Sequence, residues 1–425
     1  MAAQPVVITG MGAASPIGMG VAAFREGLLG ARSGTRAVTA FDASDLPCRV
    51  AADVTEPLEP LLTGIVEGKL VRNLSRTTMM ALIAGAEALG SARWPVKNSD
   101  DAAGAGVLGV WAGTGGAGVG WAEAQYEIYF RDGWRRTSPW GIVAGLPGML
   151  SSDLSSAFGA TGPSHVLSTG CTSSSDAISY ATLAVAMGWC DAALAGGAEA
   201  PLTRGIFSNF CRMQAMGTSF NDRPEAASRP YDRDRDGFIL GEGAWFVVLE
   251  TAEAAARRGV VPLARLAGTF STCDAHHRIR NHPSGAETAR AVRSALAAAG
   301  VDPGRIGYVN LHGSATPLND RTETLALTSV FGERTPAIPM SALKSQIGHP
   351  QGASGAAGLV ATLLGMAGGF VPATINRDHP DPDCGLDVVP REPREHRFEA
   401  AVVNAISFGS KNTALVITTP DFETE

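Results

Sequence analysis

The 425-residue chain has little of several features that mark special classes of protein. Its six cysteines are scattered and form no CxxC pair, so the common zinc motifs are excluded and nothing indicates a disulfide framework. Aromatic residues make up only 6% of the chain, whereas its 51 glycines predict many tight turns and closely packed backbones. The length suits two or three domains, or one large duplicated unit.

A surplus of positive charge is also absent. The formal net charge of −7 argues against a protein that binds nucleic acid through its general field. The apolar run near the N-terminus has no basic segment before it, which is not typical of a signal peptide. The uncharged stretch 352–375 contains several glycines and Pro372, so it favours a buried helix followed by a strand over a membrane span. We therefore expect a cytoplasmic protein with reduced thiols, bound to neither nucleic acid nor membrane.

Short strand-like runs alternate with alanine-rich helical runs along the whole chain. VVITGMG, GVLGVWAGTG and GAWFVVLE are typical of strands in the first part, and the alternation restarts after Thr251 with ARLAGTFSTCD. This rhythm predicts an α/β fold made of two similar halves, joined near residues 250–260. The segment WAEAQYEIYFRDGWRRTSPWG interrupts the first half with aromatic residues and arginines. We interpret it as an insertion packed at a subunit interface.

Two motifs resemble known binding loops but lack an essential residue. GMGAASPIG follows a strand-like run, yet Ser15 and Pro16 stand where a dinucleotide fingerprint needs its third glycine. DRDRDGFILGEG spaces its acidic residues like a calcium loop, but Gly243 takes the last position, where a carboxylate is required. A strand-like run follows it in place of a helix. We therefore predict two turns, the second charged and hydrogen-bonded, and no metal site.

One cysteine stands where a thiol can become reactive. In SHVLSTGCTSSSDAI, the apolar pair Val166–Leu167 leads through a glycine turn to Cys171 and a helix-like segment. Unpaired backbone N–H groups and the positive dipole end make a thiol at the start of a helix more acidic. Most single cysteines are nevertheless small buried hydrophobes, so the role of Cys171 depends on what the fold places beside it.

Three later segments each pair a reactive side chain with turn-forming neighbours. NLHGSATPLND places His312 at a strand end, and SALKSQIGHPQGASGAAG places Lys344 and His349 in a glycine-rich approach to a helix. In NAISFGSKNTA, the pair Phe408–Gly409 interrupts a strand. Each residue alone has an ordinary structural interpretation. Together with the thiol, they form a set on short loops at strand ends, where active sites gather in α/β folds.

In order and spacing, these segments resemble the β-ketoacyl-(acyl carrier protein) synthases of the thiolase superfamily, nearly end to end. The matching segments are VVITGMGAASPIG, TGCTSSSDA, RPYDRDRDGFILGEGA, NLHGSATPLND, LKSQIGHPQGASGAAG and the final SFG. The resemblance implies a thiolase-like, duplicated five-layered αβαβα fold. Its N-terminal half, 1–255, would carry the cysteine, and its C-terminal half, 256–425, the two histidines and the lysine. TGCTSSSDA is most similar to the catalytic ketosynthase subunit of a type II polyketide synthase.

The family mechanism implies a role for each residue. Cys171 would take an acyl chain from the phosphopantetheine arm of an acyl carrier protein, with the helix start stabilising the thiolate and no bound cofactor. Malonyl carrier protein would then lose CO2, and its enolate would attack the acyl-enzyme. His312 and His349 would donate hydrogen bonds from Nε2 to the thioester oxygen. The N–H groups of Cys171 and Phe408 would form the oxyanion hole, with Phe408 and Gly409 as the gate.

Lys344 would orient this group electrostatically through Asp320 and Glu323, which open the helix after the first histidine. The chain also departs from the family. Fatty-acid enzymes typically read NSFGFGGTN where this chain reads NAISFGSKN, and they carry a glutamate in the helix after the second histidine. The departures that we single out are Gly358, Ser410 and Lys411.

Other functions of the same fold require different residues at particular positions, and these residues distinguish the alternatives. A housekeeping fatty-acid elongation synthase is the nearest alternative to polyketide chain elongation. A thiolase needs a second catalytic cysteine, and Cys384 lies in a polar loop without the expected glycine turn. The Cys-His-Asn set of initiation-type synthases is disfavoured, because His349 stands in the GHP context. A non-catalytic chain-length subunit would lack the cysteine at position 171, although such a subunit is a plausible partner.

Two kinds of partner are expected. The first is an acyl carrier protein, which is acidic and needs a local basic face on an acidic enzyme. The second is another subunit, as a homodimer or as a heterodimer with a homologue similar to a chain-length factor. Candidate docking residues for the carrier protein, which could equally be ordinary solvated charges, are Lys69, Arg72, Arg76, Arg204 and Arg212.

Overall fold

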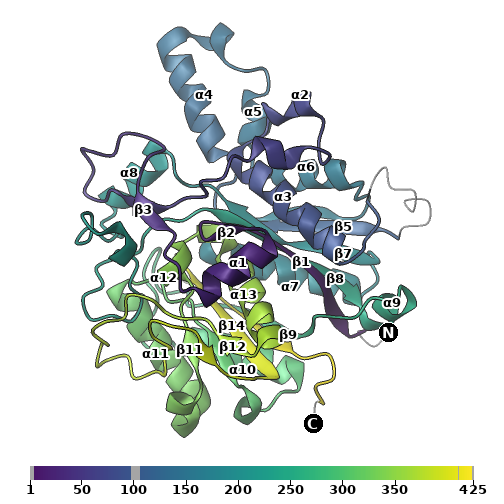
Figure 1. The fold of residues 1–425 in the computed structure, drawn as a ribbon, viewed down its shortest axis with the longest axis vertical. Coiled ribbons are helices and arrows are strands. Elements are labelled where there is room, and N and C mark those ends of the chain that lie inside the picture. Colours follow the sequence, from purple (N-terminus) through teal and green to yellow (C-terminus); the bar gives the residue numbers. More distant parts are fainter. Residues whose placement is uncertain (1–3, 97–105, 410, 424–425) are drawn as a thin grey trace.

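A computed structural model describes residues 4–96, 106–409 and 411–423, and a mixed β-sheet runs through it (Figure 1). Five of its strands belong to the first half of the chain: β1 (Val6–Ser15), β5 (Leu108–Gly113), β6 (Ser164–Leu167), β7 (Ala192–Glu199) and β8 (Gly243–Thr251). Five more belong to the second half: β9 (Ala264–Cys273), β10 (Tyr308–Asn310), β11 (Met340–Ser341), β14 (Ala400–Ser407) and β15 (Lys411–Thr418).

The two sets of strands have the same topology. The first half has the order β6-β5-β7-β8-β1, and the second has the order β11-β10-β14-β15-β9. In each set the first three strands are parallel and the last two are antiparallel to their neighbours. The sets join where β1 pairs with β9, at Val7 with Arg265 and Ile8 with Ala264. The prediction of two similar halves is confirmed by this repeated order.

Helices separate and cover the two sets of strands. α7 (Ser173–Ala186) and α13 (Ser354–Gly368) contact each other and strands of both sets, so they form the middle layer. α3 (Arg76–Ser91) and α6 (Met149–Phe158) cover the outer face of the first set. α10 (Ala286–Ala299) packs on β9 and β15, with α11 (Pro317–Phe331) against it. The result is the predicted αβαβα arrangement.

The middle layer is built from small residues. The whole of α13 up to Gly365 is buried, which confirms the buried helix predicted for the uncharged stretch. A Cβ atom on Gly355 would collide with Ser175 of α7, so glycine is required where the two helices meet. In the part of the chain that the structure describes, no helix is both long and apolar enough to span a bilayer.

The predicted insertion in the first half consists of α4 (Val119–Asp132) and α5 (Gly141–Gly145), which extend away from the layers (Figure 1). It exposes large apolar side chains, among them Tyr126, Phe130 and Trp134. The remaining elements are short: α1 (Gly20–Leu29), α2 (Gly68–Val71), α8 (Arg204–Arg212), α9 (Ala252–Arg257), α12 (Lys344–Ile347), β2 (Gly18–Met19), β3 (Thr35–Ala37), β4 (Val50–Ala52), β12 (Phe370–Val371) and β13 (Arg394–Glu395).

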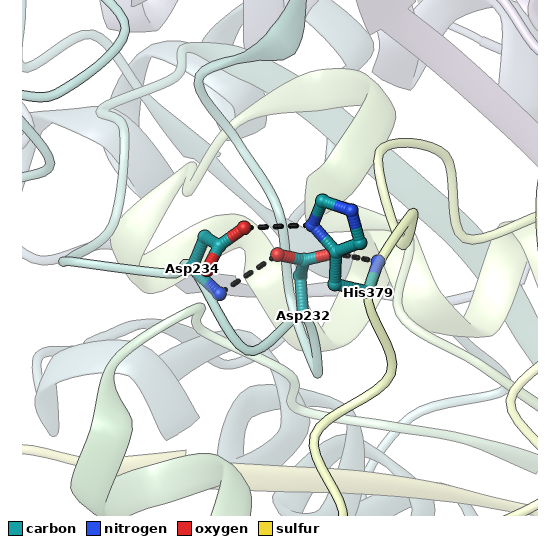
Figure 2. A group of neighbouring side chains, drawn as sticks. All are labelled: Asp232, Asp234 and His379. Atoms are coloured by element: carbon teal, nitrogen blue, oxygen red, sulfur yellow. Dashed lines mark hydrogen bonds and ion pairs between the residues drawn. The ribbon is translucent and has the colours of Figure 1, made fainter.

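Both motifs that resembled binding loops are turns, as predicted. GMGAASPIG runs along the end of β1 and through the tight turn that joins it to β2. In the acidic segment, the Asp232 carboxylate accepts N–H groups from Asp234 at 2.8 Å and from His379 at 2.7 Å (Figure 2). It also pairs with Arg229 at 3.1 Å. Asp234 also contacts the His379 ring, with 2.7 Å between its carboxylate and Nδ1. Strand β8 follows this turn, where a calcium-binding pair would place a helix.

Candidate active site

Cys171 lies in a single 3₁₀ turn, Gly170–Thr172, between β6 and α7. Gly170 has a φ angle of +76°, which glycine adopts without the steric cost of a side chain, and this turns the chain from strand to helix. The Ser173 hydroxyl oxygen accepts the N–H of Thr169 at 2.9 Å, which ties the start of α7 to the strand end. The predicted strand, turn and helix around Cys171 are confirmed.

Burial dominates the acidity of the thiol. Cys171 is 3% exposed, and its burial raises the pKa of the thiol to about 11, against the lowering effects of the Lys344 ammonium, the Phe408 N–H and the Ser407 hydroxyl. The prediction of a thiol made acidic by the helix start is wrong, because burial outweighs that effect, but the structure places an imidazole beside the sulfur. Cys171 Sγ lies 3.2 Å from His349 Nε2, so a neutral thiol can pass its proton to the imidazole as it attacks.

His349 is oriented by Ser354 at the start of α13. The Ser354 hydroxyl lies 3.1 Å from His349 Nδ1 and donates to the backbone oxygen of Gln351 at 2.8 Å. A hydroxyl has one proton, so when it donates to the carbonyl it can accept Nδ1–H, and Nε2 is then free to accept. The family resemblance instead implies a proton on Nε2, which requires the Ser354 hydroxyl to donate to Nδ1. Burial, then Lys344, lowers the pKa of His349 well below its usual value, so the ring is neutral near pH 7.

His312 faces His349, with 5.4 Å between the ring centroids and 80° between the ring planes. The Lys344 ammonium donates to the backbone oxygen of His312 at 2.5 Å and lies 3.4 Å from its Nδ1. An ammonium group only donates, so Nδ1 accepts and Nε2 of His312 carries the proton, as the sequence predicts. Burial, followed by Lys344 and His349, lowers the pKa of His312 well below its usual value. With the Ser354 hydroxyl directed to the Gln351 carbonyl, the two rings offer different groups: a donor at His312 and an acceptor at His349.

Lys344 contacts the first histidine directly, and no direct contact of its ammonium with Asp320 or Glu323 occurs among the hydrogen bonds and ion pairs of the described residues. Burial lowers the pKa of Lys344 to about 8, while the charges of Cys171, Glu323 and Asp320 raise it. Since about 8 is above neutral pH, the ammonium keeps most of its charge there. The two carboxylates thus act on Lys344 through space.

The two carboxylates of α11 fix the loop that carries His312. Glu323 accepts the N–H groups of His312 at 2.7 Å and Gly313 at 2.9 Å, and the Tyr231 hydroxyl at 2.7 Å. Asp320 accepts the N–H of Tyr231 at 2.9 Å, and its burial raises the pKa of that carboxyl to about 6. These hydrogen bonds hold the backbone of the loop that carries His312 and so position its ring at the cavity.

The acidic turn also supports the site. The side chain of Arg235 is 2% exposed and lies 3.3 Å from Asp320 and 2.7 Å from Asp381. A buried carboxylate without a counter-ion is costly, so Arg235 is the partner that allows Asp320 to stay charged. Sequence reasoning treated this segment only as a turn. The signal in the sequence is an arginine between aspartates, which is common on exposed loops too.

One cavity of about 310 Å³ collects the reactive groups, and Cys171, His312, His349, Ser407 and Phe408 all line it. Phe408 packs near Phe238, with 6.2 Å between their ring centroids. Gly409 has a φ angle of +82°, which lets the chain reverse after Phe408 before β15 begins. The structure therefore brings together the predicted nucleophile, both histidines and the gate.

Sequence reasoning missed part of the lining of this cavity. Ile279, Arg280 and Asn281, from the loop DAHHRIRNH between β9 and α10, line it together with Gln214. Three histidines and two arginines in nine residues were the available signal.

None of the five candidate docking residues lines the cavity. Lys69 pairs with Glu67, Arg76 with the buried Glu242, and Arg204 with Asp45. Arg72 and Arg212 are exposed.

Of the three departures from the family pattern, the packing around Gly358 explains one. Gly358 of α13 faces Asn310, and a Cβ atom there would collide with the Asn310 side chain, so the space of a larger residue is filled. Lys411 opens β15 opposite Cys273. Ser410 lies outside the described residues. Cys384 is buried beside Arg235 and does not line the cavity, so it is not placed as a second catalytic cysteine.

Comparisons with known proteins agree with this geometry. Residues 3–255 match the profile of the β-ketoacyl synthase N-terminal domain, and residues 263–378 match that of its C-terminal domain. The putative polyketide β-ketoacyl synthase 1 of Streptomyces halstedii is 39% identical over 98% of both chains. The 3-oxoacyl-[acyl-carrier-protein] synthase 2 of a Synechocystis strain is 36% identical over 96% of this chain and 97% of its own.

Solved structures give the same result. A β-ketoacyl synthase from Burkholderia phymatum has a TM-score of 0.89 at 32% identity, covering 98% of this chain and 99% of the other. The ishigamide ketosynthase/chain length factor has a TM-score of 0.89 at 31% identity, covering 98% and 100%. These matches define a thiolase-like condensing enzyme of the acyltransferase class. The chain belongs to the β-ketoacyl synthase family.

Proposed function

We propose that this enzyme elongates acyl chains in type II polyketide biosynthesis, by decarboxylative condensation of a Cys171-bound acyl group with malonyl carrier protein. The observation that carries the proposal is the 3.2 Å contact of Cys171 Sγ with His349 Nε2, in the cavity that His312 also lines. Residues 1–255 would supply the nucleophile and residues 256–425 the histidines and Lys344. The repeated strand order and the two matched profiles support this division.

In the first step, Cys171 attacks the thioester carbon of the carrier-bound acyl chain and passes its proton to His349 Nε2. A new C–S bond forms to the enzyme and the C–S bond to the phosphopantetheine sulfur breaks. The protonated His349 then gives its proton to that leaving thiolate. N–H groups of Cys171 and Phe408 stabilise the negative oxygen of the tetrahedral intermediate. No bound cofactor enters this scheme, because the carrier arm supplies both acyl groups.

In the second step, malonyl carrier protein loses CO2 and the electron pair of the broken C–C bond becomes an enolate. His312 donates its Nε2 proton in a hydrogen bond to the enolate oxygen. Lys344, held 2.5 Å from the backbone oxygen of His312, keeps Nδ1 as an acceptor and so keeps this donor in place. The enolate carbon attacks the acyl carbonyl, and the Cys171 sulfur leaves as a thiolate while the product forms on the carrier. One proton from solvent then restores the resting thiol, which balances the loss of CO2 from the malonyl carboxylate.

Two relatives favour different pathways. The polyketide synthase of Streptomyces halstedii is 39% identical to this chain, and the Synechocystis 3-oxoacyl synthase is 36% identical. The TGCTSSSDA segment favours polyketide elongation, and fatty-acid elongation is the second candidate. A non-catalytic chain-length role is disfavoured, because Cys171 and both histidines line one cavity.

The proposed partners are an acyl carrier protein and a second subunit. One similar structure is a type II polyketide acyl-carrier protein in complex with its ketosynthase, at 27% identity and a TM-score of 0.88. Strand β6 lies at the end of the sheet, and the neighbouring α7 and the turn after it expose large apolar side chains suited to an interface: Tyr180, Leu183, Met187 and Trp189. A homodimer or a heterodimer with a chain-length-factor homologue would cover them, in the cytoplasm where carrier proteins act. The five candidate docking residues stay proposals for the carrier.

The test is reconstitution with defined carriers. Purified protein, alone and with any co-expressed homologue, is mixed with malonyl carrier protein and a series of acyl carriers. Mass spectrometry then detects the β-ketoacyl carrier product. We expect a product with unreduced β-keto chains, absent in His312→Ala. A preference for saturated chains would favour fatty-acid elongation, and no product from any carrier or partner would refute the proposal.

A further inference from the structure

Ser407, the last residue of β14, occupies a place where its hydroxyl meets the nucleophile turn. Its side chain is buried, and its oxygen accepts the backbone N–H of Cys171 at 2.8 Å. The same hydroxyl lies 2.9 Å from the backbone oxygen of Thr169 and 3.0 Å from that of Phe408, to which it can donate its single proton. A side chain on Gly170 would collide with this hydroxyl, so the contact is close packed.

The Cys171 N–H is one of the two donors assigned above to the oxyanion hole. A backbone N–H has one proton and makes one strong hydrogen bond, so it cannot serve Ser407 and an acyl oxygen equally well. When NAISFGSKN is set against the fatty-acid pattern NSFGFGGTN, Ser407 stands where that pattern has glycine. Glycine has no hydroxyl that could compete for the donor.

We propose that Ser407 is a positioning residue that occupies the Cys171 N–H in the resting enzyme and must release it to the acyl carbonyl during acylation. This inference rests on the proposed function. On acyl transfer, the Cys171 N–H exchanges the Ser407 oxygen for the substrate oxygen, and Ser407 keeps its donation to a backbone carbonyl. Acylation is slowed by the lost hydrogen bond, whereas simple alkylation of the sulfur needs no oxyanion donor and is not slowed.

The consequence is a variant that gains activity. Removal of the hydroxyl in Ser407→Ala frees the donor, and a typical buried hydrogen bond corresponds to an increase of about threefold to tenfold in the acylation rate. Alkylation of Cys171 by iodoacetamide should not become faster, because the Ser407 hydroxyl lowers the pKa of the thiol in the wild type. A merely structural role for Ser407 would slow both reactions together.

The experiment measures both rates for the same protein samples. Acyl transfer from an acyl carrier protein is followed by rapid-quench intact mass spectrometry, and alkylation by iodoacetamide in parallel. Ser407→Ala and Ser407→Gly are compared with the wild type. Ser15→Ala is the matched control, because Ser15 is a buried serine that donates to Gly18 and does not line the cavity.

We expect faster acyl transfer without faster alkylation in both Ser407 variants, and wild-type rates in the control. Unchanged or slower acyl transfer in variants that still alkylate would overturn the inference. If neither variant folds, a structure of the acylated wild type decides, since Ser407 must then have left the Cys171 N–H. A wild type that alkylates but never accepts an acyl group would refute the proposed function instead.

Discussion

The contact between the Ser354 hydroxyl and His349 predicts how far the acylation rate falls when the hydroxyl is removed. In the proposed mechanism the Ser354 hydroxyl, 3.1 Å from Nδ1, accepts Nδ1–H and so leaves Nε2 ready to take the proton of Cys171. In Ser354→Ala, Nδ1–H loses its acceptor, and the ring can shift to the tautomer with the proton on Nε2, which cannot act as the base. Loss of one buried neutral hydrogen bond costs about 1 kcal/mol, which corresponds to about a fivefold fall in the acylation rate.

The assay is the single-turnover acylation rate, with histidine ¹⁵N chemical shifts measured on the same variants. Thr362→Val is the matched control, because Thr362 also lies in α13 and its hydroxyl donates only to the backbone oxygen of Gly358, at 2.7 Å. We expect the control to acylate at the wild-type rate. A wild-type spectrum with the His349 proton on Nε2, or an unchanged rate in Ser354→Ala, would show that the assignment of the base is wrong.

Two other substitutions test the supports of the site. In Glu323→Gln the carboxylate that raises the pKa of Lys344 is lost, so this pKa falls below about 8. The high-pH limb of the plot of rate against pH should therefore move to lower pH. A limb at the wild-type position would contradict the electrostatic role of Glu323. Arg235→Ala leaves Asp320 buried without its partner and should lower the free energy of unfolding by about 3–5 kcal/mol in denaturant titrations. The exposed Arg257→Ala is the control and should change it by less than about 0.5 kcal/mol.

Much of the fold follows from the sequence because the strands are buried on both faces and contain few charges. Runs such as GAWFVVLE and AVVNAISFG read as strands and form β8 and β14. The glycine before Cys171 likewise predicts the sharp turn, since its positive φ angle favours glycine. The local sequence pattern was sufficient to predict those strands and turns whose backbone conformation depends on their own residues alone.

The parts that escaped prediction depend on contacts between distant segments. Ser407 meets Cys171 across 236 positions of sequence, and Arg235 meets Asp320 from another loop. Serine at a strand end and arginine in an acidic turn are ordinary residues, so no local signal marks them. The proton position that we propose for His349 depends on one hydroxyl, on Ser354, which lies beside the ring only in the folded chain and which no local sequence pattern marks.

The central claim is that Cys171 carries the acyl chain. Intact mass spectrometry after incubation with an acyl carrier protein, with any co-expressed partner present, measures this directly in the wild type, Cys171→Ala and the exposed-cysteine control Cys273→Ala. We predict a gain of one acyl group in the wild type and the control, and none in Cys171→Ala. An acyl group that persists in Cys171→Ala, or no gain in the wild type with any carrier and partner, would contradict the account.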